Sequence, residues 1–197
     1  VAGSATGTVE GFNLEYGGVV VRAKSLKYGG IVGGGSARIV DCYYRGDITA
    51  LDFESASVGG IAGEAGSVVN CGGKSGGFAA FDGTIHVSGG ADKTSAYAGL
   101  VVGKSNSVTN CTAKGSVIAA GLTTAYAGGI VGYSGSVGYV RFEGSVSVVA
   151  DMIYAGGAVG EATSVGNSSV VAKIEVDDHD GESNAEAFVG GIVGSGV

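Results

Sequence analysis

Tyr126-Ala-Gly-Gly-Ile-Val-Gly132 returns with few changes along the whole chain of 197 residues. The copies are Tyr97-Ala-Gly-Leu-Val-Val-Gly103, Tyr154-Ala-Gly-Gly-Ala-Val-Gly160, Phe188-Val-Gly-Gly-Ile-Val-Gly194, and the shorter Gly29-Gly-Ile-Val-Gly33, Gly59-Gly-Ile-Ala-Gly63 and Val1-Ala2-Gly3. Their last glycines stand at positions 3, 33, 63, 103, 132, 160 and 194, so the steps are 30, 30, 40, 29, 28 and 34 residues. One period of about 30 residues with two insertions is typical of a stacked repeat protein.

Each period carries two further short segments at fixed places. The first reads Ser67-Val-Val-Asn-Cys71 or Ser107-Val-Thr-Asn-Cys111, and the second reads Gly115-Ser-Val117 or Gly144-Ser-Val146, with Ala172-Lys-Ile174 as a degenerate member. All of these segments are short, rich in β-branched residues and bounded by Gly, Asn or Ser, which predicts strands. We therefore expect three short strands in each period.

A unit of three short strands cannot bury its apolar side alone, but stacked units join their inward residues into one core. The repeat therefore predicts an all-β fold, a right-handed parallel β-solenoid (β-helix) of about six turns with a rise of ~4.8 Å per turn. An antiparallel β-sandwich would also explain alternating apolar residues. It would not explain a three-segment layout that occurs six times.

The composition agrees with a coil of strands. The chain has 41 glycines and no proline, and 45% of its residues are hydrophobic. Collagen needs proline and a strict three-residue period, disorder needs fewer apolar residues, and glycine disfavours helices. Corners with positive φ explain the glycines, and proline would remove a donor from the strand ladders.

The charge of the chain argues against nucleic-acid binding, and its hydropathy argues against a membrane-spanning segment. The formal net charge is −7, so the chain lacks the basic footprint that binds a nucleic-acid backbone. The apolar stretches are short and are interrupted by charged residues such as Asp151 and Glu161. We therefore expect no membrane-spanning segment.

The order Gly-Gly-Ile-Val-Gly, Ser-Val-x-Asn-Cys, Gly-x-Val resembles the GLUG-motif repeats of bacterial cell-surface proteins, with Asn70-Cys71 and Asn110-Cys111 as its most specific part. Such repeats also occur in amino-terminal regions of IgA-cleaving metallopeptidases. The similarity covers essentially the whole chain, although Val140 and Ser168 replace the cysteine. The resemblance implies a secreted or surface-attached, extracellular protein whose repeats act as a spacer or an adhesive surface.

Residues 1–197 are expected to form a single solenoid domain. Both ends fall inside or close to a copy of the repeated strand, and neither resembles the polar cap that a solenoid end needs. The chain is therefore expected to be a fragment of a longer surface protein, with further repeats or domains of the parent chain as its neighbours.

No catalytic, cofactor-binding or metal-binding constellation is predicted, and the chain is not expected to be an enzyme. The only histidines are His86 and His179, and neither begins the His-Glu-x-x-His pattern of a metallopeptidase. His86 follows Ile85 and precedes Val87, so strand alternation points it to solvent. The expected function is that of a non-enzymatic adhesin or structural spacer, and the alternative is a β-helix that binds or processes polysaccharide.

Aromatic residues supply the candidate ligand surface, whose partner would be a host molecule or a glycan. Tyr97, Tyr126, Tyr154 and Phe188 occupy one address in four consecutive turns. Outward rings would suit stacking on sugars, whereas inward rings would be core or corner packing, which is the favoured arrangement. Phe78 and Phe81 lie in the first insertion, and loops on a regular scaffold often carry binding.

Three further features have a structural and a chemical interpretation. Cys42, Cys71 and Cys111 should stack on consecutive turns as buried thiols, although the rise would also allow one disulfide. Residues 177–182 form an acidic turn, which is expected to be solvated and could alternatively hold Ca²⁺. Arg45-Gly46-Asp47 spells an integrin-binding tripeptide, but the repeat already explains Gly46 as a strand opener.

Overall fold

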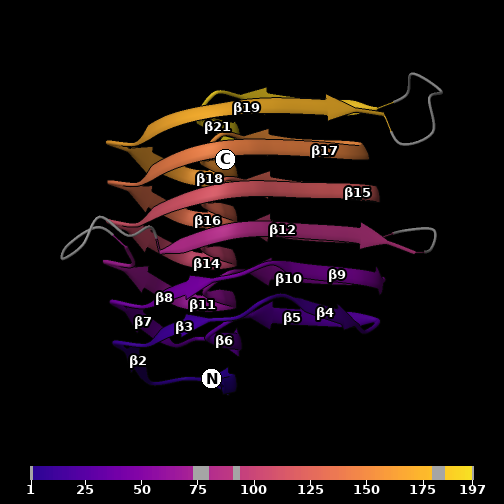
Figure 1. Cartoon of the computed structure of the whole chain (residues 1–197). Helices are drawn as coiled ribbons and strands as arrows, with labels where there is room; N and C mark the ends of the chain where they lie inside the picture. The colour runs from indigo at the N-terminus through magenta and orange to yellow at the C-terminus, as the bar shows by residue number, and fades with distance from the viewer. Residues whose placement is uncertain (1, 73–79, 91–93, 179–184, 197) are drawn as a thin grey trace.

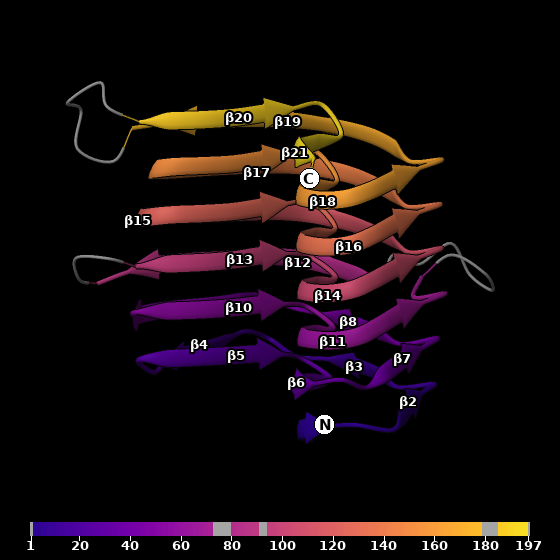
Figure 2. The same cartoon turned by 180° about the vertical axis from the view of Figure 1, so that it is seen from behind.

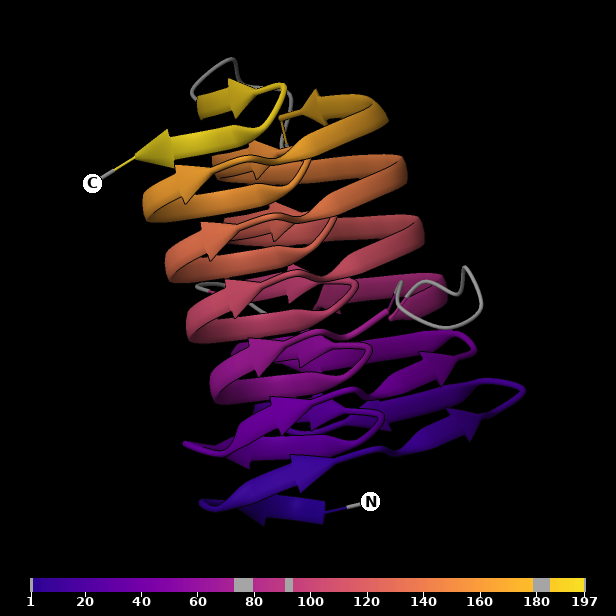
Figure 3. The same cartoon turned by 90° about the vertical axis from the view of Figure 1, so that its left-hand side faces the viewer.

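Parallel strands coil around one axis in this computed structural model, which describes residues 2–72, 80–90, 94–178 and 185–196. The chain forms the predicted β-solenoid of about six turns with a period of about 30 residues. The turns end at the glycines predicted from the repeat, so we number them by residues 2–33, 34–63, 64–103, 104–132, 133–160 and 161–194. Figure 3 shows them from the side as stacked, flattened loops.

The coil is right-handed. The strands at the front run from left to right in Figure 1, and those at the rear run from left to right in Figure 2, which is seen from behind. The chain rises from the N-terminus at the bottom toward the top in both views, and these directions together define a right-handed coil. This agrees with the general rule for parallel crossovers.

Every turn contributes to three faces, which we call A, B and C in chain order. Face A holds β1 (Ala2–Ala5), β2 (Thr8–Glu10), β6 (Val32–Gly35), β7 (Arg38–Val40), β11 (Ala62–Val69), β14 (Val102–Thr109), β16 (Val131–Gly138), β18 (Val159–Gly166) and β21 (Val193–Gly196). Face B holds β3 (Asn13–Glu15), β4 (Val19–Arg22), β8 (Tyr43–Arg45), β9 (Ile48–Phe53), β12 (Phe81–Gly89) and β19 (Ser169–Asp177). Face C holds β5 (Ser25–Gly29), β10 (Ser55–Gly59), β13 (Ser95–Gly99) and β20 (Glu186–Gly190).

The middle turns are more continuous than the sequence suggests. In the fourth and fifth turns faces B and C are joined into the single long strands β15 (Thr112–Gly128) and β17 (Arg141–Gly156). In the first two turns face A is instead split into two short strands. The positions of the repeated segments therefore predicted which strands pair. The length of each strand differs between turns, because some corners interrupt the strand and others do not.

Like residues pair with like residues across the turns. Tyr97, Tyr126 and Tyr154 are in register, as are the buried Val102, Val131 and Val159 of face A. The ladder continues through the corner between faces C and A, where Ile31 donates its N–H to the carbonyl oxygen of Ile61 at 3.0 Å. We call each set of residues in register a row.

One continuous core fills the coil. Its largest buried side chains include Phe142, Ile85, Leu122 and Ile130, all of which have 0% exposure. Glycine pairs permit the tight corner above it, because a Cβ at Gly129 would overlap the ring of Phe142 and the carbonyl oxygen of Gly157. In the described residues no helix is long and apolar enough to cross a membrane.

Candidate functional site

The aromatic row lies outside the core, at the step where face C turns into face A. Tyr97 alternates with Ala96 and Ala98, both fully buried, while Tyr97 itself is half-buried. Phe188, in the last turn, is 38% exposed. The rings therefore lie on the outer side of the strands of face C, and the inward arrangement favoured from the sequence is wrong.

The rings form one regular stack. Tyr97 and Tyr126 have their ring centroids 4.7 Å apart, Tyr126 and Tyr154 are 4.6 Å apart, and Tyr154 and Phe188 are 5.1 Å apart, with interplanar angles of 18°, 5° and 8°. This spacing equals the distance between hydrogen-bonded strands, so the backbone ladder sets the stack. Each such aromatic pair contributes ~0.5–1.5 kcal/mol beyond the burial of its area.

Side chains of face A close over the lower part of this stack. The ring of Tyr133 meets Tyr97 edge-on at 6.1 Å, and the Lys104 ammonium lies 5.1 Å from the centroid of Tyr97 and 5.3 Å from that of Tyr133. Burial, followed by neighbouring Tyr97 and Glu161, raises the pKa of Tyr126 to about 12. Burial also raises the pKa of the Glu161 carboxyl.

The stack limits what the row can bind. A sugar ring stacks on the face of an aromatic ring, but both faces of Tyr126 and of Tyr154 are already covered by neighbouring rings. Their edges and hydroxyl groups remain, and the Tyr154 hydroxyl donates to the sulfur of Met152 at 3.4 Å. At the two ends of the stack, the Lys104 ammonium lies over the ring of Tyr97, and Phe188 is 38% exposed.

Phe81 is not part of any ligand surface, which corrects the prediction made for it. It shares an inward row with Tyr44 and Phe142, has 0% exposure, and stacks on Tyr44 with centroids 5.8 Å apart. The first strand residue after the insertion thus returns to the core pattern. Phe78 lies outside the described residues.

A row of alternating charges, which was not predicted from the sequence, follows face B. Its members, in order of turn, are Glu15, Arg45, Asp82, Lys114 and Glu143. The contacts along it include Arg45 to Asp82 at 4.0 Å and Lys114 to Glu143 at 3.2 Å. The residue before each Gly-x-Val or Gly-x-Ile segment shows this alternation for four of the members, Arg45, Asp82, Lys114 and Glu143.

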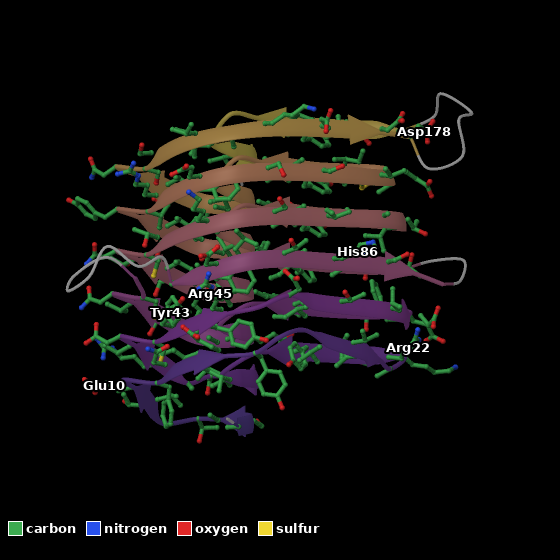
Figure 4. All side chains as sticks on the ribbon, viewed as in Figure 1. Glu10, Arg22, Tyr43, Arg45, His86 and Asp178 are labelled. Carbon is green, nitrogen blue, oxygen red and sulfur yellow. The ribbon has the colours of Figure 1, made fainter. Side chains whose placement is uncertain are left out.

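Contacts with the next turn involve both charged side chains of the Arg45-Gly46-Asp47 tripeptide. Arg45 is a member of the charge row, and the Asp47 carboxylate accepts the N–H of Thr84 at 2.7 Å. Both side chains are thus engaged with the next turn. Figure 4 shows Arg45 on the front face, beside Tyr43.

A shallow hollow accompanies the lower part of the charge row. Its volume is about 500 Å³, and its lining includes Glu15, Tyr16, Arg45, Asp47 and Asp82. The lining thus combines three carboxylates from three consecutive turns with one arginine. The exposed Tyr16 ring supplies an apolar wall.

The three cysteines stack as predicted, as free buried thiols. The Cys42 Sγ donates to the carbonyl oxygen of Val40 at 3.3 Å, and Cys111 makes the equivalent bond to Thr109 at 3.4 Å. Burial raises the pKa of Cys42 to about 11. The hydrogen bond with Cys111, followed by burial, raises the pKa of Cys71. The Cys42 and Cys71 thiols are therefore protonated core groups and poor nucleophiles.

The two remaining candidates are His86 and the acidic turn of residues 177–182. His86 lies between the buried Ile85 and Val87 and points out of face B, as predicted (Figure 4). Of the acidic turn, Asp177 and Asp178 are described, and the Asp177 carboxylate accepts the N–H of Asp178 at 2.9 Å, whereas residues 179–182 are outside the described part. In the described residues no three acidic, His or Cys side chains gather in a way that could hold a metal ion.

Comparison with known proteins adds no relative. No protein-family model matches the chain, and neither a search of curated proteins nor a search of solved structures found a match.

Proposed function

We propose that this chain is a non-enzymatic repeat module of an extracellular, surface-attached protein, in which the solenoid acts as a spacer or an adhesive surface. One observation carries the proposal: aromatic and charged side chains of this surface make contacts with the neighbouring turns. The tyrosine faces cover one another, Arg45 faces Asp82, and the Asp47 carboxylate receives the N–H of Thr84. Such groups hold a rod together and are not free for catalysis.

The resemblance to GLUG-motif repeats supports the surface location. It supplies a context in which a rod-like module separates or presents other parts of a protein. The proposed partners are further repeats or domains of the parent chain and a host or glycan ligand.

A mechanical measurement tests the spacer role. We expect single-molecule pulling along the axis to give high unfolding forces in steps that correspond to whole turns, because each turn is paired along its length with the next. A chain that extends without resistance would contradict the spacer role.

The hollow on face B favours a second candidate function, carbohydrate binding. The Glu15 carboxylate in its lining would accept hydrogen bonds from hydroxyl groups beside the exposed Tyr16 ring. We would screen acidic and neutral oligosaccharides by nuclear magnetic resonance and compare Tyr16→Ala with Tyr139→Ala, a matched control that removes an exposed tyrosine elsewhere.

The outcomes separate the two candidates. Binding that Tyr16→Ala abolishes and Tyr139→Ala keeps would support a glycan-binding role of the hollow. Cleavage of a polysaccharide by the purified chain would overturn the non-enzymatic proposal. Absence of binding in the whole screen would contradict the adhesive role toward glycans and leave the spacer.

A further inference from the structure

Three phenol rings form one column on the outside of face C. Tyr97 in β13, Tyr126 in β15 and Tyr154 in β17 are in register, and Figure 2 shows these strands one above the other. Among the described residues, the face-to-face ring contacts in which both partners are tyrosines are Tyr97 with Tyr126 and Tyr126 with Tyr154. The column therefore holds side by side groups that can react with one another.

Neighbouring phenols have a characteristic oxidation chemistry. A phenol that loses one electron and its proton becomes a phenoxyl radical, in which the oxygen and the two ortho ring carbons share the unpaired electron. Two such radicals combine at ortho carbons, and the product of two tyrosine side chains is dityrosine. Two rings that the fold holds together react more readily than two rings that must meet by diffusion.

Tyr126 and Tyr154 have the geometry that this reaction needs. Their ring centroids are 4.6 Å apart and their planes are inclined by only 5°. Both side chains are half-buried, so the ring edges remain open to solvent. A turn of each ring about its Cβ–Cγ bond brings the ortho carbons together. The strands need not move, because the centres of two directly bonded rings are separated by nearly the same distance as neighbouring strands.

Charge favours this pair over the pair below it. The Lys104 ammonium lies 5.1 Å from the centroid of Tyr97, and a positive charge beside a ring opposes the loss of an electron from it. The rings of Tyr97 and Tyr126 are also inclined by 18°. Tyr154 instead donates its hydroxyl to the uncharged sulfur of Met152 at 3.4 Å. The upper pair is therefore the first to react.

We propose that Tyr126 and Tyr154 are a site of oxidative cross-linking, where a one-electron oxidant, such as an oxidised haem or metal complex, joins them as dityrosine. The oxidant takes one electron from each ring, and each phenolic proton passes to water. The two unpaired electrons form one bond between ortho carbons, and the hydrogen of each of these carbons moves to the oxygen of its own ring. In total the chain loses two electrons and two protons and gains no atom.

The link joins the fourth turn to the fifth by a covalent bond outside the core. The two tyrosines are 28 positions apart, so the link closes a loop of one whole turn and restricts the unfolded chain. The core and the strand ladders stay as they are, because both rings lie on the outer side of face C. Cross-linking should therefore stabilise the coil without changing its shape.

Oxidation of the dilute chain tests the cross-link. A light-activated ruthenium complex with persulfate serves as the one-electron oxidant, since it is small enough to reach half-buried rings. We expect dityrosine fluorescence in the monomer band of a denaturing gel and a mass lower by two hydrogen atoms. The yield should not depend on protein concentration, because both rings belong to one chain. Digestion and mass spectrometry should find the peptide of Tyr126 joined to that of Tyr154.

Two results of this experiment would overturn the proposal. One is dityrosine that occurs in dimers alone, and the other is oxidation of Met152 to the sulfoxide without dityrosine. Exposed tyrosines could couple between molecules, and Tyr16 and Tyr139 are 60% and 65% exposed. The experiment is therefore repeated with a chain that carries Tyr16→Phe and Tyr139→Phe, in which these two side chains cannot become phenoxyl radicals.

Phenylalanine substitutions in the column separate oxidation from packing. Phe188 stacks on Tyr154 with centroids 5.1 Å apart and planes inclined by 8°, so the row accepts a ring without a hydroxyl. Tyr126→Phe removes the shared partner and should abolish dityrosine within the monomer. Tyr97→Phe should leave the link intact. Tyr133→Phe changes a tyrosine that meets Tyr97 edge-on, and this matched control should not alter the yield.

A second variant and a stability measurement complete the test. Tyr154→Phe should leave only a weaker link between Tyr97 and Tyr126, and circular dichroism confirms that each variant is folded. After oxidation, the urea midpoint of the native chain should rise, whereas that of Tyr126→Phe should not. An unchanged yield of dityrosine in the monomer of Tyr126→Phe or of Tyr154→Phe would show that other tyrosines are joined and would refute the assignment.

Discussion

One position of face B has the same backbone conformation in four consecutive turns, and this conformation explains why the position is occupied by glycine. Gly46, Gly83, Gly115 and Gly144 have φ values of +138°, +153°, +137° and +155°. This region is strained for residues that carry a Cβ. Ala172, the degenerate member in the last turn, does not have positive φ, so the column of glycines ends where the coil opens.

Gly115→Ala should lower the free energy of unfolding by about 3 kcal/mol or more, because strain adds to a steric overlap. The new Cβ would meet the carbonyl oxygen of Gly83 directly beneath it. Urea unfolding followed by circular dichroism measures the loss. Gly138→Ala, whose Cβ would find only the Gly166 oxygen at 3.9 Å, should change stability little; equal effects of the two variants would contradict the explanation.

The buried thiol of Cys42 predicts a loss of stability in alkali. Its pKa rises from the ordinary value of 9.0 to about 11 in the fold, so the folded chain keeps a proton that the unfolded chain loses. The stabilisation present below pH 9 is then lost as the pH rises toward 11. Urea midpoints between these pH values should fall less steeply for Cys42→Ala, and identical slopes would refute the assignment.

At the scale of the element, each corner combines a backbone conformation with a side-chain ladder. One residue ends the strand of face A in each of five successive turns, with φ between 48° and 55°: Asp41, Asn70, Asn110, Tyr139 and Asn167. Asn110 also donates its side-chain amide to the Asn70 side-chain oxygen at 2.8 Å. Asparagine is suited to this corner because it tolerates the left-handed region and can bond to its own kind.

Two substitutions of Asn110 separate these contributions. Asn110→Gly keeps the left-handed conformation and loses the amide bond, which should cost about 1 kcal/mol. Asn110→Ala loses both, and should cost a further ~1 kcal/mol. Thermal unfolding of the native chain and the two variants measures the order of their stabilities. If the alanine variant were as stable as the glycine variant, backbone strain would not determine the residue at this corner.

The repeat period predicted most of the elements, since like segments had to pair. It predicted three faces, the stack of cysteines and the outward position of His86. It did not predict the side of the aromatic row, because Tyr97 and Ala98 both lie in an apolar run and alternation alone does not tell which one enters the core. It also misplaced Phe81, where the end of an insertion concealed the inward row that begins again at that residue.

The polar hollow escaped prediction for a different reason. Glu15, Arg45 and Asp82 are about thirty or more residues apart and belong to no local motif. They come together only through the rise of the coil, which the sequence analysis used for apolar residues and not for charged ones.

At the scale of the whole molecule, the solenoid is a one-dimensional stack whose stability depends on contacts between neighbouring turns. The middle turns have a neighbour on both sides, and their inward residues are fully buried. The end turns have a neighbour on one side, and Val176 and Val189 remain 37% and 47% exposed.

Hydrogen exchange should therefore follow the position along the axis. In dilute solution, we expect the slowest amide exchange in β14, β15, β16 and β17 and the fastest in β1 to β5 and β19 to β21, because end turns open without the rest. Exchange followed by mass spectrometry of peptides gives this profile. Uniform protection along the chain would show that all six turns open together.

The alternating charges of face B bear on how a chain of near-identical turns finds the correct neighbour during folding. A turn that skipped its proper partner would still stack tyrosine on tyrosine and valine on valine, so those rows tolerate the error. In the charge row, however, a skipped turn would set Arg45 against Lys114, or Asp82 against Glu143. The row thus distinguishes odd from even turns, which the rows of identical tyrosines and valines do not.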